Sequence, residues 1–175
     1  MIFTLVGRWA SLHPSLLLNH HIQHPVIEDR LARLRQRDCP PSDFRRCVRT
    51  ISQLMVPSVT ANLLTLPIEV ETPMEITTGR RLEREIILAP VLRAGLGMLD
   101  GFLDLLPEAS VAHVGLARNE DTLQPECYYH KSPEHIADGD VIVLDPMLAT
   151  GGSASAAITE LKKQGAKHLS FACMV

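Results

Sequence analysis

The sequence has few of the features that mark several common classes of protein. Aromatic residues make up only 4% of its 175 residues, and the net charge is -3, so bulk charge indicates no basic surface for nucleic acid. No apolar run approaches the roughly 18 residues of a membrane span. We therefore expect a globular protein that binds neither nucleic acid nor membrane. Its length favours one domain with a hydrophobic core.

Cysteine is also scarce. The four cysteines, at positions 39, 47, 127 and 173, form no C-x-x-C pair, which argues against a structural zinc cluster and against a disulfide scaffold. Free thiols fit a reducing compartment, so we expect a cytoplasmic location. Cys127 and His130 could be half of a metal site, but no second half is evident in the sequence. We expect no metal held by protein ligands.

The first 22 residues lack sustained periodicity. Met1 to His21 is apolar but interrupted by Arg8, His13 and Pro14, and it does not follow the pattern of a signal peptide. We expect residues 1–22 to be an extension that is either poorly ordered or upstream of the true start. Residues 23–175 are expected to form the folded domain.

Two amphipathic helices are predicted next. The first starts at Pro25 and ends before Cys39-Pro40-Pro41. The second starts at Ser42 or Asp43, the candidate N-caps, and Pro57 predicts an end or kink near Val56. Its exposed face carries the arginines Arg45, Arg46 and Arg49. They fit a solvated helix face better than a phosphate site, although both interpretations stay open.

A hairpin or arm and a strand–loop–helix unit follow. Residues 66–78 are rich in β-branched residues and predict an antiparallel hairpin or arm, with a turn at 78–81. A short buried strand over 85–89 then leads into a glycine-containing loop and a helix over residues 98–106. Arg93 in this loop could present its planar guanidinium to an anionic group, or it could be a surface or capping arginine. The glycine spacing does not match the dinucleotide-binding pattern, which argues against a Rossmann dehydrogenase.

Another strand is predicted over 110–117, with Arg118 at its end. Residues 119–139 then show no helical periodicity and include turn-forming residues. A connection of this length without a helix is usually functional, so we interpret it as a lid or arm.

The most informative stretch is 141–153. Four apolar residues, Val141 to Leu144, predict a strand buried on both faces, and Asp145 follows at its carboxyl end. The small residues after it lead into a helix, an arrangement that suits a sugar phosphate because backbone N–H groups and the helix N-terminus attract anions. An ordinary turn with Ser153 as the N-cap is the competing interpretation. A helix over 154–161 and a strand over 168–175 complete the chain.

Three of these segments resemble the uracil phosphoribosyltransferase family, within the type I phosphoribosyltransferases. Residues 143–153 resemble the family's phosphoribosyl pyrophosphate loop, and residues 90–101 resemble its pyrophosphate loop. Residues 117–122 resemble a third signature, and His24-Pro25 resembles the family's usual start. The similarity runs in order from about His24 to Val175.

The resemblance implies a three-layer α/β fold with a central parallel sheet flanked by helices and an extra β arm. It implies the conversion of uracil and phosphoribosyl pyrophosphate to UMP and pyrophosphate, a reaction of pyrimidine salvage. The donor would be held by Asp145, Pro146, Met147, Leu148, Ala149, Thr150, Gly151, Gly152 and Ser153. Asp145 would hold the ribose hydroxyls, and Arg93 and Arg118 would face the pyrophosphate. Mg²⁺ would accompany the donor, and a homodimer or larger assembly is expected.

Two departures limit the expectation. Many phosphoribosyltransferases have two adjacent acids before the loop, whereas here Asp145 is followed by Pro146, as it is in the uracil-specific members. The family's uracil-recognition segment would follow Val175, so we expect the chain to be truncated and assign no residue to uracil. GTP activates some members of the family, but no residue of this sequence can be assigned to GTP binding. The competing hypothesis is a non-catalytic module that binds the donor or only oligomerises.

Overall fold

The computed structural model describes residues 3–6, 18–119 and 125–175. Its strands are β1 (Phe3–Val6), β2 (Leu18–His21), β3 (Thr65–Glu71), β4 (Ile76–Leu82), β5 (Ile86–Leu92), β6 (Ser110–Val111), β7 (His113–Arg118), β8 (Pro125–Lys131), β9 (Asp140–Leu144) and β10 (His168–Ala172). Its helices are α1 (Pro25–Leu34), α2 (Pro41–Thr60), α3 (Leu96–Leu103) and α4 (Gly152–Lys163).

One eight-stranded sheet organises the chain, in the order β2-β1-β10-β9-β5-β7-β8, with β6 beside β5. The strands β10, β9, β5, β6 and β7 run parallel. Antiparallel strands close both edges, with β8 on one side and β1 and β2 on the other. The sheet is therefore mixed but mostly parallel, and its centre is the parallel core that the sequence predicts.

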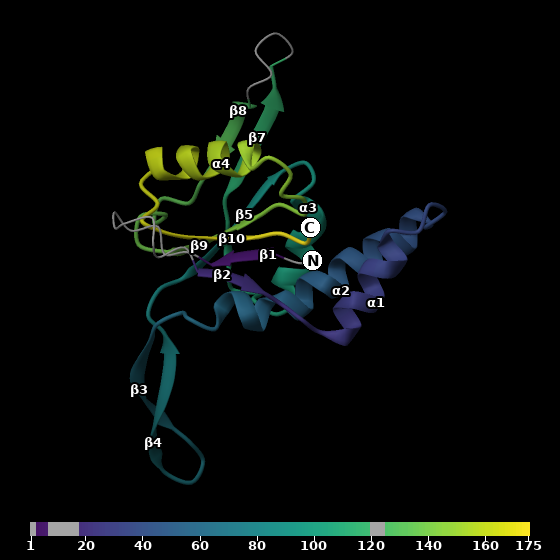
Figure 1. Cartoon of the computed structure of the whole chain (residues 1–175). Coiled ribbons are helices and arrows are strands. Elements are labelled where there is room, and N and C mark those ends of the chain that lie inside the picture. The colour runs from purple at the N-terminus through teal and green to yellow at the C-terminus, as the bar shows by residue number, and fades with distance from the viewer. Residues whose placement is uncertain (1–2, 7–17, 120–124) are drawn as a thin grey trace.

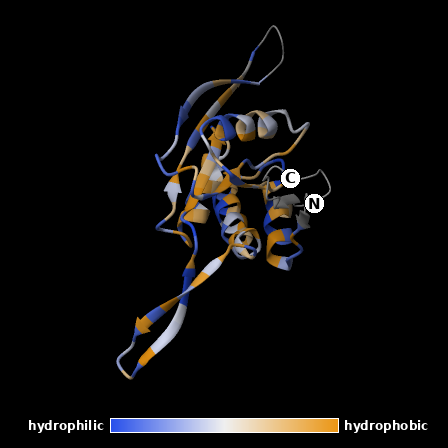
Figure 2. Ribbon diagram, turned by 90° about the vertical axis from the view of Figure 1, so that its left-hand side faces the viewer, coloured by the Kyte–Doolittle hydropathy of each residue, from blue (hydrophilic) through white to orange (hydrophobic). Residues whose placement is uncertain are grey.

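Helices cover both faces of this sheet (Figure 1). In β5, Ile86 and Leu88 pack into the core formed with α1, α2 and α3, whereas Ile87, Ala89 and Val91 pack into the core formed with α4. Successive side chains of a strand point to opposite faces, so a strand covered on both sides must be apolar throughout. Figure 2 shows this as a hydrophobic centre beneath more hydrophilic outer elements. The predicted three-layer α/β fold is confirmed.

The helix α2 continues through Pro57 to Thr60, so an end near Val56, one of the two predicted alternatives, is wrong, and a kink there stays a prediction. Pro57 is exposed, and a carbonyl left without its helical N–H partner on that face can bind water. Val56 and Val59 are buried on the opposite side, and their packing holds the last turn in helical form. The predicted caps are also wrong, because Pro40 is the N-cap and the helix starts one residue later, at Pro41. A proline at the first helical position already has the helical φ, which favours this earlier start.

The predicted arm is a separate two-stranded sheet of β3 and β4 that projects from the body (Figure 1). Its turn lies at residues 72–75, not at 78–81. The Thr72 hydroxyl donates to the Glu75 carbonyl and accepts the Glu75 N–H, which closes the turn there. Gly79 instead pairs with Ile68 inside the ladder.

Two short strands fall within the predicted extension. β1 pairs with β10, and β2 pairs with β1, while residues 1–2 and 7–17 lie outside the described residues. Part of the predicted lid or arm at 119–139 is β8, which pairs with β7; residues 120–124 are also outside the described part. Among the described residues, no helix is both long and apolar enough to cross a membrane.

Candidate active site

Three predicted site segments leave the sheet at one edge. The register aligns Pro90 of β5 with Leu144 of β9, and Leu92 of β5 with Gly115 of β7. The three strands are parallel, so their carboxyl ends share the edge at which open α/β sheets bind ligands. Arg93 follows β5 and Asp145 follows β9, and Arg118 is the last residue of β7.

The loop after β5 packs directly against the end of β9. A side chain on Gly95 would place its Cβ 2.4 Å from the Leu144 carbonyl oxygen and 2.6 Å from the Val91 nitrogen. Only a glycine fits so close to two stretches of backbone. The Gly95 N–H also donates to the Val91 carbonyl over 2.8 Å, which folds the loop back on its strand. Arg93 and Asp145 are thereby carried by two loops in contact.

Asp145 is one of the few polar residues in the core, with 9% of its surface exposed. Its Oδ1 accepts the Met147 N–H over 3.3 Å, and its own N–H donates to the Ala172 carbonyl over 3.2 Å. Burial raises the pKa of Asp145 above its ordinary value, and the bond from Met147 only partly offsets this. A carboxylate that is fixed and partly desolvated suits the recognition of hydroxyl groups or a cation.

The segment from Pro146 to Ser153 is an open loop followed by the first turn of α4. The Pro146 carbonyl accepts the Met174 and Val175 N–H groups, and the Leu148 N–H donates to the Val175 carbonyl, so the start of the loop is anchored to the chain after β10. Ala149, Thr150 and Ser153 are exposed.

Gly151 rather than Ser153 is the N-cap of α4, and it has a φ of 77°. No side chain caps the helix, so the N–H groups of its first turn remain open to a ligand. This fits an anion site better than the competing turn capped by Ser153.

The structure describes the side chain of one predicted arginine, Arg93, and only the backbone of the other, Arg118. Arg93 is exposed, and among the described residues its guanidinium has no hydrogen-bond or ion-pair partner, so it is available to a ligand. The backbone of Arg118 pairs with Pro125 at the end of the β7–β8 ladder, and its side chain lies outside the described part of the structure.

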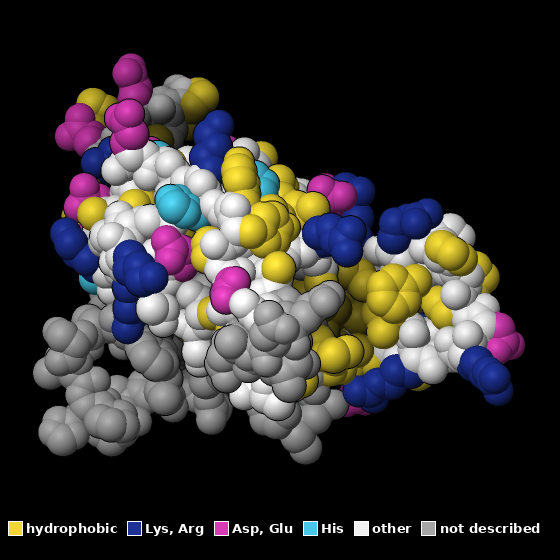
Figure 3. All heavy atoms as spheres, turned by 90° about the horizontal axis from the view of Figure 1, so that it is seen from above, with side chains coloured by type: hydrophobic (Ala, Val, Ile, Leu, Met, Phe, Trp, Pro, Cys, Tyr) yellow, Lys and Arg dark blue, Asp and Glu magenta, His cyan; other side chains and the backbone are white. Residues whose placement is uncertain are grey.

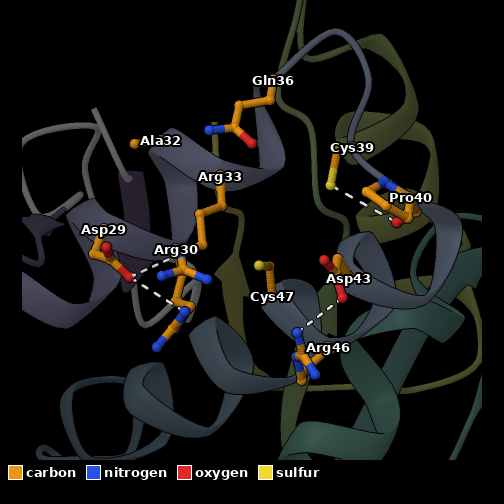
Figure 4. Close-up of a pocket in the computed structure, with 10 residues that line it drawn as sticks. All are labelled: Asp29, Arg30, Ala32, Arg33, Gln36, Cys39, Pro40, Asp43, Arg46 and Cys47. Atoms are coloured by element: carbon orange, nitrogen blue, oxygen red, sulfur yellow. Dashed lines mark hydrogen bonds and ion pairs between the residues drawn. The ribbon is translucent and has the colours of Figure 1, made fainter.

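A cavity of about 350 Å³ lies elsewhere, between α1 and α2 (Figure 4). Its arginines are paired: Arg46 donates to Asp43 over 2.8 Å, and Arg30 and Arg33 both contact Asp29. None of its lining residues belongs to the three loops. Arg49 is likewise bound, by Asp104. Two members of the arginine cluster on α2 are thus paired with carboxylates, as on a solvated helix face.

Residues 21–175 match the family model described as uracil phosphoribosyltransferase. The chain belongs to the uracil phosphoribosyltransferase family. It is similar to the uracil phosphoribosyltransferases of Clostridium beijerinckii, with 50% identity over 155 residues, and Ligilactobacillus salivarius, with 44% identity over 155 residues. Each alignment covers 88% of this chain and 74% of the relative.

Two solved structures are similar to this chain. The AQ2163 protein from Aquifex aeolicus is 32% identical, with a TM-score of 0.78 over 86% of this chain and 72% of that one. A hypoxanthine-guanine phosphoribosyltransferase from Bacillus anthracis is 10% identical, with a TM-score of 0.53 over 74% of this chain and 66% of that one. The second likeness concerns the fold alone.

Sequence reasoning missed two contributors to this site. It predicted only a glycine-containing loop after the strand, whereas Gly95 lies against the backbones of Leu144 and Val91. It also overlooked the backbone pairing of Pro146 with Met174 and Val175. The glycine itself is a readable signal, but the atoms that crowd it come from distant parts of the chain.

Proposed function

We propose that this chain transfers ribose 5-phosphate from phosphoribosyl pyrophosphate to uracil, giving UMP and pyrophosphate. The observation that carries the proposal is the contact between the Arg93 loop and the end of β9, because it unites two loops with complementary roles. Membership in the family supports the choice of donor and acceptor.

The proposed roles follow from charge and position. The open N-terminus of α4 and residues 149–153 would bind the 5-phosphate. Asp145 would hold the ribose hydroxyls. Arg93 and Arg118 would bind the pyrophosphate, with Arg93 free to do so among the described residues. Pro146, Met147 and Leu148 would shape the loop between these groups.

The chemistry needs positioning more than covalent help. The bond from ribose C1 to the pyrophosphate oxygen breaks, with its electron pair leaving on that oxygen, while a bond from C1 to a uracil nitrogen forms and that nitrogen releases its proton to solvent. Positive charge develops on the ribose and negative charge on the leaving group. Fixed cations at the leaving group and a carboxylate beside the ribose stabilise both, and one such preorganised group can contribute about 3 kcal/mol.

Magnesium fits beside the donor. Mg²⁺ prefers oxygen ligands and is commonly held by one or two carboxylates together with substrate phosphates. Asp145 has such a carboxylate, and the Met147 N–H occupies only its Oδ1. Bound Mg²⁺ would neutralise charge on the pyrophosphate.

The surface gives further support for small-molecule substrates. Positive, negative and hydrophobic side chains are interspersed over the face seen in Figure 3, rather than segregated into one basic field. Cys39, Cys47 and Cys127 are free thiols, which fits the cytoplasmic location that we propose.

Self-association is part of the proposal. The β3–β4 arm exposes large apolar side chains, with Met74 92% and Ile76 64% exposed. Exposed apolar surface of this kind is typical of interaction sites, and it supports a homodimer or larger homo-oligomer.

The experiment is a product assay with the purified chain. Mg²⁺ and phosphoribosyl pyrophosphate are mixed with uracil, cytosine or hypoxanthine in turn, and the nucleotides are separated and measured. We expect UMP from uracil and no product from the other bases. Donor binding without any product would instead favour the non-catalytic module. Adding GTP to the same assay tests whether this chain is activated by it.

A further inference from the structure

Cys127, His130 and Glu160 form a cluster where β8 lies against α4. The register between β7 and β8 shifts between Gly115 and Leu116: Gly115 pairs with Tyr129, but Leu116 pairs with Cys127. The extra residue, Tyr128, makes a β-bulge. Residues three apart on a regular strand point to opposite faces, and the bulge brings Cys127 and His130 to the same one.

That face meets α4. Cys127 lies opposite Leu116, which packs against the same core as α4, and His130 lies opposite the buried Val114 of that core. Glu160 comes from α4, and its Oε1 is 3.7 Å from Nδ1 of His130. One ligand atom of each of the three residues lies within 4.8 Å of those of the other two. A hydrogen bond between Ser132 and Gln164 holds the end of β8 to the same helix.

The three groups suit one class of ion. A thiolate and an imidazole favour borderline and soft transition metals, and they exclude Mg²⁺, which prefers an all-oxygen environment. In tetrahedral zinc sites, bond lengths of about 2.0–2.3 Å separate the ligand atoms by roughly 3.3–3.6 Å. The His130–Glu160 separation of 3.7 Å is near that spacing, and the other two pairs of ligand atoms lie within 4.8 Å. Cys127 and His130 are exposed, so their side chains have room to rotate toward a shared ion.

We propose that Cys127, His130 and Glu160 bind a transition-metal ion of the Zn²⁺ class, with solvent as the fourth ligand. This proposal departs from the sequence-based expectation that no metal is held by protein ligands. The residue that would complete the half-site is Glu160 of α4, 30 residues beyond His130. Glu160 is suited to the role because its side chain is only 15% exposed. A hydrogen bond from Lys163 keeps the pKa of Glu160 below its ordinary value.

The site is separate from the donor loops. Glu160 lies eight residues beyond the start of α4, which is about 12 Å along the helix. A metal there would tie β8 to α4 and so fix the base of the β7–β8 hairpin. Its main effect would be on the stability of this region rather than on the reacting atoms.

Metal titration of the full chain tests the proposal. Calorimetry with Zn²⁺ is expected to give one site per chain, and Co²⁺ is expected to give the near-ultraviolet absorption of a cobalt–thiolate bond. Cys127→Ser should abolish that absorption, and His130→Ala and Glu160→Gln should each weaken Zn²⁺ binding at least about tenfold. The control is Cys39→Ser, because Cys39 lies outside the cluster and this variant should keep both signals.

Lys163→Ala provides a second, independent variant. The Lys163 amine contacts Oε2 of Glu160 over 3.2 Å and competes with a cation for that carboxylate, so its removal should tighten Zn²⁺ binding. The proposal is overturned if the chain binds no Zn²⁺, if the three ligand variants bind it as tightly as the parent, or if the cobalt–thiolate absorption survives Cys127→Ser.

Discussion

At the scale of single residues, Asp145 combines a proposed role in donor binding with a cost in stability. Burial raises its pKa, so the folded chain holds this proton more tightly than the unfolded chain does. The contribution of this proton to the free energy of unfolding is fully present below the ordinary pKa of aspartate. It is lost as the pH rises through the raised pKa of Asp145 in the folded chain. At neutral pH the buried carboxylate therefore lowers the stability of the fold, and a group that is kept despite such a cost is typical of a functional site.

Asp145→Asn should separate these two effects. We expect a higher Tm at pH 7, because the buried charge is gone, and a gain that shrinks as the pH falls toward the ordinary pKa of aspartate. UMP formation should fall by a factor on the order of 10²–10³. Thermal melts across pH, together with the product assay, check both expectations.

Asp104→Asn is the matched control, because the hydrogen bond from Arg49 lowers the pKa of Asp104. Its stabilising effect is present above the ordinary aspartate pKa and is lost as the pH falls through the lowered one. This variant should lower the Tm at pH 7. A higher Tm in both variants would contradict the explanation that Asp145→Asn raises the Tm by removing a buried charge.

Gly95 offers a second test at this scale. An alanine Cβ would lie within 2.7 Å of three backbone atoms, so the loop must shift, and Gly95→Ala should lower the free energy of unfolding by about 1–3 kcal/mol. At Gly97 the nearest atom to a new Cβ is a side-chain carbon 3.4 Å away, so Gly97→Ala should cost little or even stabilise α3. Denaturant unfolding compares the two variants. Equal losses in the free energy of unfolding would show that Gly95 is not crowded by the backbone around it.

At the scale of elements, local patterns predicted what local physics controls. The apolar runs of β5 and β9 and the periodicity of α1 gave the correct element types because burial on one or both faces dictates them. The end of α2 and the bulge at Tyr128 could not be read in the same way. Both depend on distant partners: the core around Val59 in one case and the β7 register in the other.

Pro57 tests this explanation of α2. Pro57→Ala restores an N–H donor inside the helix, and the packing that already holds the turn is unchanged. We expect an increase of about 1–3 kcal/mol in the free energy of unfolding, measured by denaturant titration. A decrease would mean that the proline stabilises this turn through the unfolded state instead.

At the scale of the whole molecule, the sheet order brings the predicted site residues together. The sequence predicted each of the segments around Arg93, Arg118 and Asp145 separately, but their meeting at one edge follows from β5 lying between β9 and β7. Only the resemblance to a family supplied that arrangement in advance. The Glu160 contact with β8 had no such guide and was missed.

Assembly can be tested at this scale. A single chain has a mass of 19.3 kDa, and the exposed apolar residues of the β3–β4 arm favour association. Sedimentation equilibrium should therefore give twice this mass or more. A particle of one chain across the micromolar range would contradict the expected homo-oligomer.

The central claim is that the loops after β5 and β9 form one donor site. It is tested most directly by calorimetric binding of Mg²⁺–phosphoribosyl pyrophosphate to the chain and to three variants. Loss of a charged hydrogen-bonding group costs about 1.5–3 kcal/mol, which is tenfold or more in Kd, so Arg93→Ala and Asp145→Asn should each weaken binding at least about tenfold. Arg46→Ala, in the cluster on α2, should bind the donor as the parent does. Unchanged affinity in the first two variants, or a loss confined to Arg46→Ala, would contradict the account.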